Sequence, residues 1–88
     1  MTEESKDHAR KVEIAEISAI MKMSSGRNVM ARILRDAGVF NSTYVKDNPE
    51  ETIRRSIRRD FGLQLAQHLE EAAPGEYFTL LKEMKNAT

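Results

Sequence analysis

Apolar positions recur along this chain at spacings of three and four residues, which is the period of an α-helix. No stretch alternates apolar and polar residues over the roughly six positions that a half-buried strand needs. Four glycines and two prolines divide the chain into segments of helical length. The pattern therefore predicts an all-α fold, a small bundle of about four helices.

The first predicted helix covers about residues 4–23 and has two apolar faces. At 100° per residue, about a third of its circumference is occupied by Ile14, Ile17, Ile20 and Met21. A second, weaker face consists of Val12, Ala15, Ala19 and Met23. Surplus apolar surface on a small domain commonly marks an interface. We therefore interpret residues 1–24 as a helix that is either enclosed by its own bundle or bound to a partner, and residues 25–88 as a compact helical domain.

The second predicted helix begins near Ser24 or Ser25, either of which can cap it. It is expected to end at Gly38, a residue type that tolerates the left-handed conformation following a helix. Residues 39–47 are too irregular for a helix and too short for a sheet. This loop contains three large apolar residues, Phe40, Tyr44 and Val45. We expect them to anchor the loop by folding back over the helices, because a surface loop rarely exposes such groups without a use for them.

The third predicted helix has the clearest start signal in the sequence. Asn48 is placed as the N-cap, Pro49 at the first helical position, and Glu51 three residues after the cap. The helix is expected to stop at Pro74, because the residue before a proline resists the helical conformation. A fourth helix then covers about residues 74–85.

An apolar row follows this third helix in steps of four residues: Ile53, Ile57, Phe61, Leu65 and Leu69. Such a row drifts about 40° per step around a helix of 3.6 residues per turn. The apolar surface at the end of the row therefore points well away from the surface at its beginning. The row predicts either a bend near Gly62 or two halves that dock against different neighbours.

The one concentrated charge feature is an arginine quartet in the same helix: Arg54, Arg55, Arg58 and Arg59. Its spacing places it away from Ile53 and Ile57. Guanidinium groups suit carboxylates and phosphates alike, so the quartet is a solvated face with pairs to Glu51, a protein interface or a nucleic-acid surface. Residues 27–60 contain eight positive and five negative side chains, a smaller excess than nucleic-acid binders normally show. Nucleic acid is therefore the weaker alternative.

The residue types that carry catalysis or bind metals are scarce or badly spaced. There is no Cys, and the two histidines, His8 and His68, lack ligand partners at the spacing of helical metal sites. No serine has the context of a nucleophile elbow, and no glycine-rich phosphate loop is present. We expect no catalytic, metal or cofactor site. No apolar run approaches the roughly 18 residues of a membrane span, and the N-terminus lacks the apolar stretch of a secretory signal.

A set of short motifs covers about residues 25–85: Gly26-Arg27, Asp36-Ala37-Gly38-Val39-Phe40, Ser42-Thr43-Tyr44, Arg59-Asp60-Phe61-Gly62-Leu63 and Pro74-Gly75-Glu76-Tyr77. These motifs resemble a family of small podophage proteins, which are encoded in the structural-gene region of tailed bacteriophages and have no assigned activity. The resemblance implies a virion-associated or assembly role and no catalytic residues.

The expectation from residues and resemblance together is a non-enzymatic bacteriophage protein in the virion or the host cytoplasm. It would act through protein-protein contacts near portal, tail or internal proteins, with other phage structural proteins or a second copy of the chain as partners. The residues expected to bind the partner are Ile14, Ile17, Ile20, Met21, Arg54, Arg55, Arg58 and Arg59. The alternatives are a small nucleic-acid-binding accessory protein that uses the arginine quartet and an inhibitor of a host protein.

Overall fold

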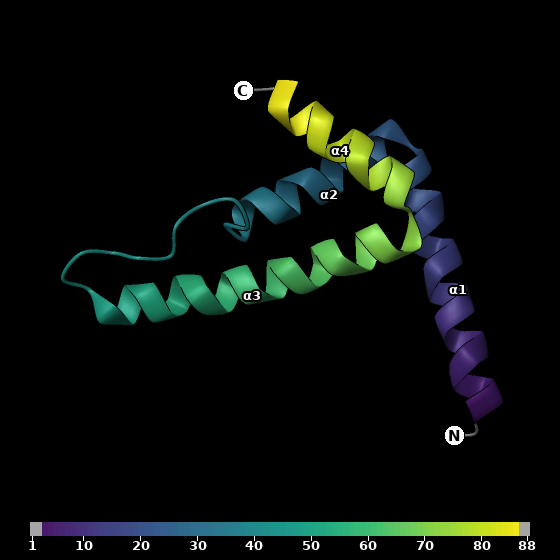
Figure 1. Ribbon diagram of the computed structural model, residues 1–88, viewed down its shortest axis with the longest axis horizontal. Coiled ribbons are helices and arrows are strands. Elements are labelled where there is room, and N and C mark those ends of the chain that lie inside the picture. The colour runs from purple at the N-terminus through teal and green to yellow at the C-terminus, as the bar shows by residue number, and fades with distance from the viewer. Residues whose placement is uncertain (1–2, 87–88) are drawn as a thin grey trace.

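Four α-helices make up the part of the chain that the computed structural model describes, residues 3–86 (Figure 1). They are α1 (Glu3–Lys22), α2 (Ser24–Asp36), α3 (Pro49–Ala72) and α4 (Pro74–Asn86). No residue within 3–86 belongs to a strand, which confirms the all-α prediction. The outermost positions of the two predicted segments, 1–2 and 87–88, lie outside the described residues.

Most of the predicted helix ends are confirmed. Asn48 caps α3, because its Oδ1 accepts a hydrogen bond from the Glu51 backbone N–H at 3.1 Å. Gly38 has a φ of 75° directly after α2, the left-handed conformation that favours glycine. The serine cap of α2 is wrong: the N-cap is Met23, which forms no side-chain cap. With α1 ending at Lys22, a single residue separates the two helices, so Ser24 already lies inside α2.

The turn between α1 and α2 depends on a glycine and an arginine. A Cβ on the buried Gly26 would overlap the backbone carbonyl of Ile20, so only glycine fits this close approach. The neighbouring Arg27 donates from Nη1 to the Met21 carbonyl at 2.9 Å and from Nε to Glu83 Oε1 at 2.6 Å. One guanidinium therefore joins the end of α1, the start of α2 and α4.

The hydrophobic core lies where the four helices meet. Its buried residues are Met21, Leu34, Ala37, Val39, Ala66, Leu69, Ala73 and Leu80. Among these, α3 contributes only positions from its C-terminal half. Gly62 lies at the same crossing, where an added Cβ would be 2.6 Å from the Ala37 Cβ, so its lack of a side chain lets α2 and α3 pack closely.

Two helices extend well beyond this core. Figure 1 shows the N-terminal halves of α1 and α3 running away from the junction in different directions. The Cα radius of gyration is 15.5 Å, whereas a compact chain of this length would have about 12 Å. Long stretches of helix therefore have neighbours on one side at most.

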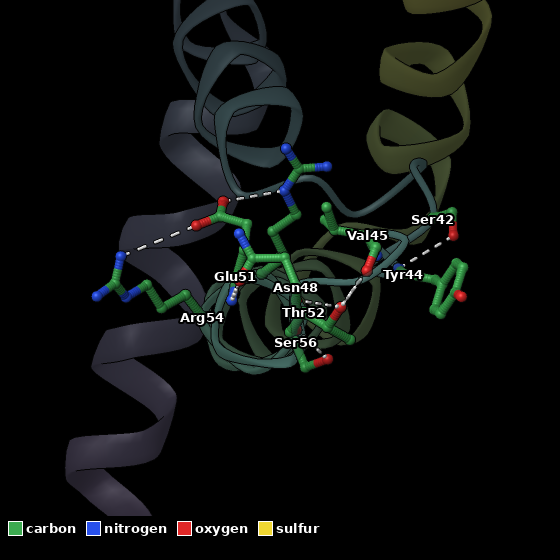
Figure 2. Close-up of polar contacts among 9 residues, drawn as sticks. Ser42, Tyr44, Val45, Asn48, Glu51, Thr52, Arg54 and Ser56 are labelled. Atoms are coloured by element: carbon green, nitrogen blue, oxygen red, sulfur yellow. Dashed lines mark hydrogen bonds and ion pairs between the residues drawn. The ribbon is translucent and has the colours of Figure 1, made fainter.

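The loop between α2 and α3 is held in a different way from the one predicted. Phe40 is 55% exposed and Tyr44 is 70% exposed, so the predicted aromatic anchors are wrong. The loop is attached by polar contacts instead: the Val45 N–H donates to Thr52 Oγ1 at 2.9 Å, and the Asn48 N–H donates to the Val45 carbonyl at 3.2 Å (Figure 2). Tyr44 lies beside the start of α3, whereas Phe40 lies next to α4, where it lines a hollow with Leu81 and Met84 and still keeps more than half of its surface exposed.

Candidate interaction surfaces

The N-terminal half of α3 carries its large apolar side chains on the outside. Ile53, Ile57 and Phe61 are 59%, 66% and 68% exposed. We call these three residues the α3 stripe. They occupy successive turns of one helix face, since each step of four residues moves the side chain only about 40° around the helix. The predicted apolar row is therefore present, but its first half docks against nothing within the described chain.

The apolar surface continues from the stripe onto the preceding loop. A shallow hollow of about 300 Å³ lies between the loop and the start of α3, and its lining includes Tyr44, Val45, Pro49 and Ile53. Tyr44, at 70%, is the most exposed of the large hydrophobic residues in residues 3–86. The stripe and Tyr44 together form a patch of the kind that marks contact sites on small proteins.

The opposite side of the same half-helix faces the chain itself. A polar hollow of about 290 Å³ separates it from the end of α2, and Arg35, Asp36, Arg55 and Arg58 are among its lining residues. Arg55 and Arg58 thus border the end of α2 while remaining exposed, and the apolar stripe faces solvent on the other side of the half-helix.

The structure divides the arginine quartet rather than presenting it as one face. Glu51 pairs with Arg55 at 3.1 Å and with Arg54 at 3.9 Å, which confirms the predicted intrahelical pairs (Figure 2). Arg58 lines the polar hollow against α2. The Nε of Arg59 is enclosed and has no hydrogen-bond partner among the described residues. Only part of the quartet is therefore available as an open basic surface.

The apolar face of α1 is directed toward its own bundle. Met21 is completely buried in the core, so it is not available to a partner in this fold. Ile17 packs against the core, and Ile14 and Ile20 are half-buried. The structure therefore brings these four residues to the helix junction. The side of α1 that remains exposed is the weaker one, with Val12, and Met23, directly after the helix, is exposed as well.

A groove between α2 and α4 was missed in the sequence. It consists of two adjoining hollows of about 440 and 510 Å³ that share Arg35 and Met84. We call it the α2–α4 groove. The sequence did hold one signal, because Arg27, Arg32 and Arg35 place three basic residues on one short helix. Nothing in the local pattern shows that α4, about 50 residues later, forms the other wall.

The chemistry of the remaining polar groups is sparse. Across residues 3–86, no group of three or more His, Cys, Asp or Glu side chains could hold a metal ion. No helix in this range is both long and apolar enough to cross a membrane.

The pKa of Tyr77 is raised above its ordinary value of 10.0 by burial, and the nearby Glu70 carboxylate raises it further. Tyr77 packs against the core, so it belongs to the interior of the bundle.

Comparison with protein families, curated proteins and solved structures gives no match for this chain. The two candidate interaction surfaces of the chain are therefore the α3 stripe and the α2–α4 groove.

Proposed function

We propose that this chain is a non-enzymatic interaction module that binds a partner protein through the α3 stripe. The observation that carries the proposal is the exposure of three large apolar side chains on successive turns of one helix. Moving a side chain of this size out of water stabilises a complex by about 1.5–3 kcal/mol when burial is complete. The stripe therefore offers a partner substantial binding energy that the isolated chain does not use.

The surroundings of the stripe have the composition of an interface. Tyr44 extends the patch at one end, and tyrosine is enriched among the residues that dominate binding energies. Arg54 lies about 60° around the helix from Ile57 and is mostly exposed, which places a charged group at the rim. An apolar centre with a polar rim is typical of protein-protein contacts.

The biological setting in this proposal comes from the podophage motifs. They support a role in the bacteriophage particle or its assembly, near portal, tail or internal proteins, in the virion or the host cytoplasm. The partner is then another phage structural protein or a second copy of the chain. Inhibition of a host protein through the same stripe is the related alternative.

A nucleic-acid-binding role for the arginine quartet is the alternative from another class. Three features weaken it: Glu51 neutralises part of the charge, Arg58 faces the end of α2, and Arg59 is half-buried. A phosphate backbone is bound most strongly by an open row of cations. Binding to duplex DNA below micromolar concentration at about 0.15 M salt, with a steep salt dependence, would favour this alternative over the stripe.

The proposal is tested by exchanging Ile57 for Glu in a phage that carries this gene. The matched control is Val12→Glu, which places the same charge on an exposed apolar residue of α1. Mass spectrometry of particles purified through a density gradient and washed with nuclease should show a loss of the Ile57→Glu chain and retention of the Val12→Glu chain. Equal retention of both variants, with both folded by circular dichroism, contradicts the role of the stripe.

A further inference from the structure

The α2–α4 groove is a continuous channel along two helices. On α2 its lining residues recur at i, i+1, i+4, i+5 and i+8, and they span about 12 Å of one helix face from Arg27 to Arg35. On α4 the lining comes from positions 80–85. Because Arg35 and Met84 line both hollows, the two hollows form one groove.

The floor of this groove is apolar and adaptable. Ala31, Leu81 and Met84 are half-buried and pack against the core, and Phe40 forms the end of the groove with more than half of its surface exposed. A methionine has a flexible, polarisable side chain that fits differently shaped apolar partners. The floor therefore suits apolar side chains inserted from outside.

The rim of the groove is strongly basic. Arg27, Arg32, Arg35 and Lys85 line it together with a single carboxylate, Glu83, which gives four positive charges against one negative and a net of three. Arg27 and Glu83 neutralise each other across the groove at 2.6 Å. Arg32 and Arg35 form no ion pair with any residue in 3–86. Their guanidinium groups are thus placed to pair with carboxylates of a ligand.

We infer that the α2–α4 groove binds an acidic amphipathic helix of a partner protein. An apolar floor between basic rims is complementary to a helix whose apolar stripe is bordered by Glu and Asp. A helix fits better than an extended peptide, because the described residues offer no strand edge, and a third helix can pack its ridges into the groove between two others. A nucleic acid would match the rim but would leave the apolar floor without a partner.

This second surface does not depend on the α3 stripe. No residue of the stripe lines the groove, and no residue of the groove belongs to the stripe. A chain with both surfaces active can hold two partner segments at once, which suits a protein that joins components of an assembly.

The test uses the full chain and two synthetic peptides of about four helical turns. Both peptides carry leucines at the same i, i+3, i+4 and i+7 spacing, and one borders them with Glu where the other has Lys. Titration into isotope-labelled protein at about 0.15 M salt, followed by amide chemical shifts, locates and quantifies binding. The Glu peptide should shift amides of Ala31, Arg35, Leu81 and Met84 and bind about tenfold more tightly than the Lys peptide.

A charge exchange makes the test sharper. The double variant Arg32→Glu, Arg35→Glu should invert the preference, so that the Lys peptide binds more tightly. The matched control, Arg54→Glu with Arg58→Glu, makes the same charge change on α3 and should leave the preference for the Glu peptide in place. If the groove double variant does not fold, the variant Arg32→Gln with Arg35→Gln is used instead. It should bind the Glu peptide about tenfold more weakly than the unaltered chain does.

Three results overturn the inference. The first is a Glu peptide whose affinity is unchanged in both groove variants. The second is a Glu peptide that shifts only amides of α3 and no longer binds the Ile57→Glu chain. This result contradicts binding in the groove and supports the proposed function. The third is displacement of the peptide by duplex DNA with a steep salt dependence, which assigns the groove to nucleic acid. Conversely, the groove can bind the Glu peptide while Ile57→Glu has no effect on particle incorporation. That result supports this inference and contradicts the proposed function.

Discussion

The two halves of α3 differ in which residues they bury: the C-terminal half buries mostly small residues, whereas the N-terminal half exposes its large apolar residues. In the C-terminal half the buried positions are Gly62, Ala66 and Leu69, two of which are small. In the N-terminal half the three largest apolar residues, Ile53, Ile57 and Phe61, are each more than half exposed. Both halves belong to one uninterrupted helix, so their helical conformation does not explain the difference.

The neighbours of a helix therefore decide which of its residues are buried. The C-terminal half crosses the end of α2, and the absent side chain at Gly62 lets Ala37 and Val39 approach closely. The N-terminal half has the end of α2 beside Arg55 and Arg58, and beside Ile53 it has only the loop residues around Tyr44. Under the proposed function, this exposed stripe is the surface that the partner protein covers.

Truncating one residue in each half of α3 should give the largest difference in the free energy of unfolding. Leu69→Ala removes a side chain that is almost fully buried and should lower the free energy of unfolding by about 2–5 kcal/mol. Ile57→Ala removes a similar volume from an exposed site and should change it by less than about 1 kcal/mol. Urea denaturation of both variants checks this pair. Similar losses in the two variants would show that the N-terminal half is part of the core.

A second prediction concerns the close crossing at Gly62. Gly62→Ala places a Cβ against Ala37 and Val39, so it should destabilise the chain by about 1–3 kcal/mol despite the better helix propensity of alanine. The control is Gly75→Ala, where no atom lies within 4 Å of the added Cβ. That variant should be neutral or stabilised by up to about 1 kcal/mol. A stable Gly62→Ala chain in thermal denaturation would mean that the two helices are not in close contact.

Removing the side-chain cap at the start of α3 should have a smaller effect on stability. Asn48→Ala removes the cap bond to the Glu51 N–H and should lower stability by about 1 kcal/mol. Ser24→Ala is the matched control at the start of α2, because that helix has no side-chain cap. It should change stability by less than about 0.5 kcal/mol. Equal effects in the two variants, measured by urea denaturation, would remove the distinction between a capped and an uncapped start.

The smallest expected change is a pH dependence of stability at Tyr77 of α4. The pKa of Tyr77 is raised in the fold, first by burial and then by the Glu70 carboxylate. The folded chain therefore holds this proton more tightly than the unfolded chain. The resulting stability is fully present below about pH 10 and is lost as the pH rises through the folded-state pKa. Tyr77→Phe should flatten the fall in melting temperature above that pH, whereas Tyr44→Phe, at an exposed site, should retain it.

Local signals in the sequence predict much of this fold. The Asn48 cap, the Gly38 turn and the break before Pro74 each depend on residues within one turn of one another, and the structure confirms them. The pairs from Glu51 to Arg54 and Arg55 are confirmed for the same reason, because their spacing along one helix decides their contact.

The interaction surfaces depend on contacts between distant segments, and the sequence predicts them poorly. Periodicity locates the apolar row of α3, but it does not show that no helix covers Ile53 and Ile57. The exposure of Tyr44, which lies beside Ile53, follows from the same missing neighbour. The α2–α4 groove requires Arg35 and Met84 to lie together, and no local pattern encodes that contact.

Amide hydrogen exchange along α3 of the isolated chain shows whether the N-terminal half of this helix lies outside the core. If it does, its amides around Ile57 should exchange through local opening and be far less protected than those around Leu69. Protection should therefore rise markedly from residues 53–61 to residues 66–72. Uniform protection along the whole helix, equal to that of the core, would contradict it.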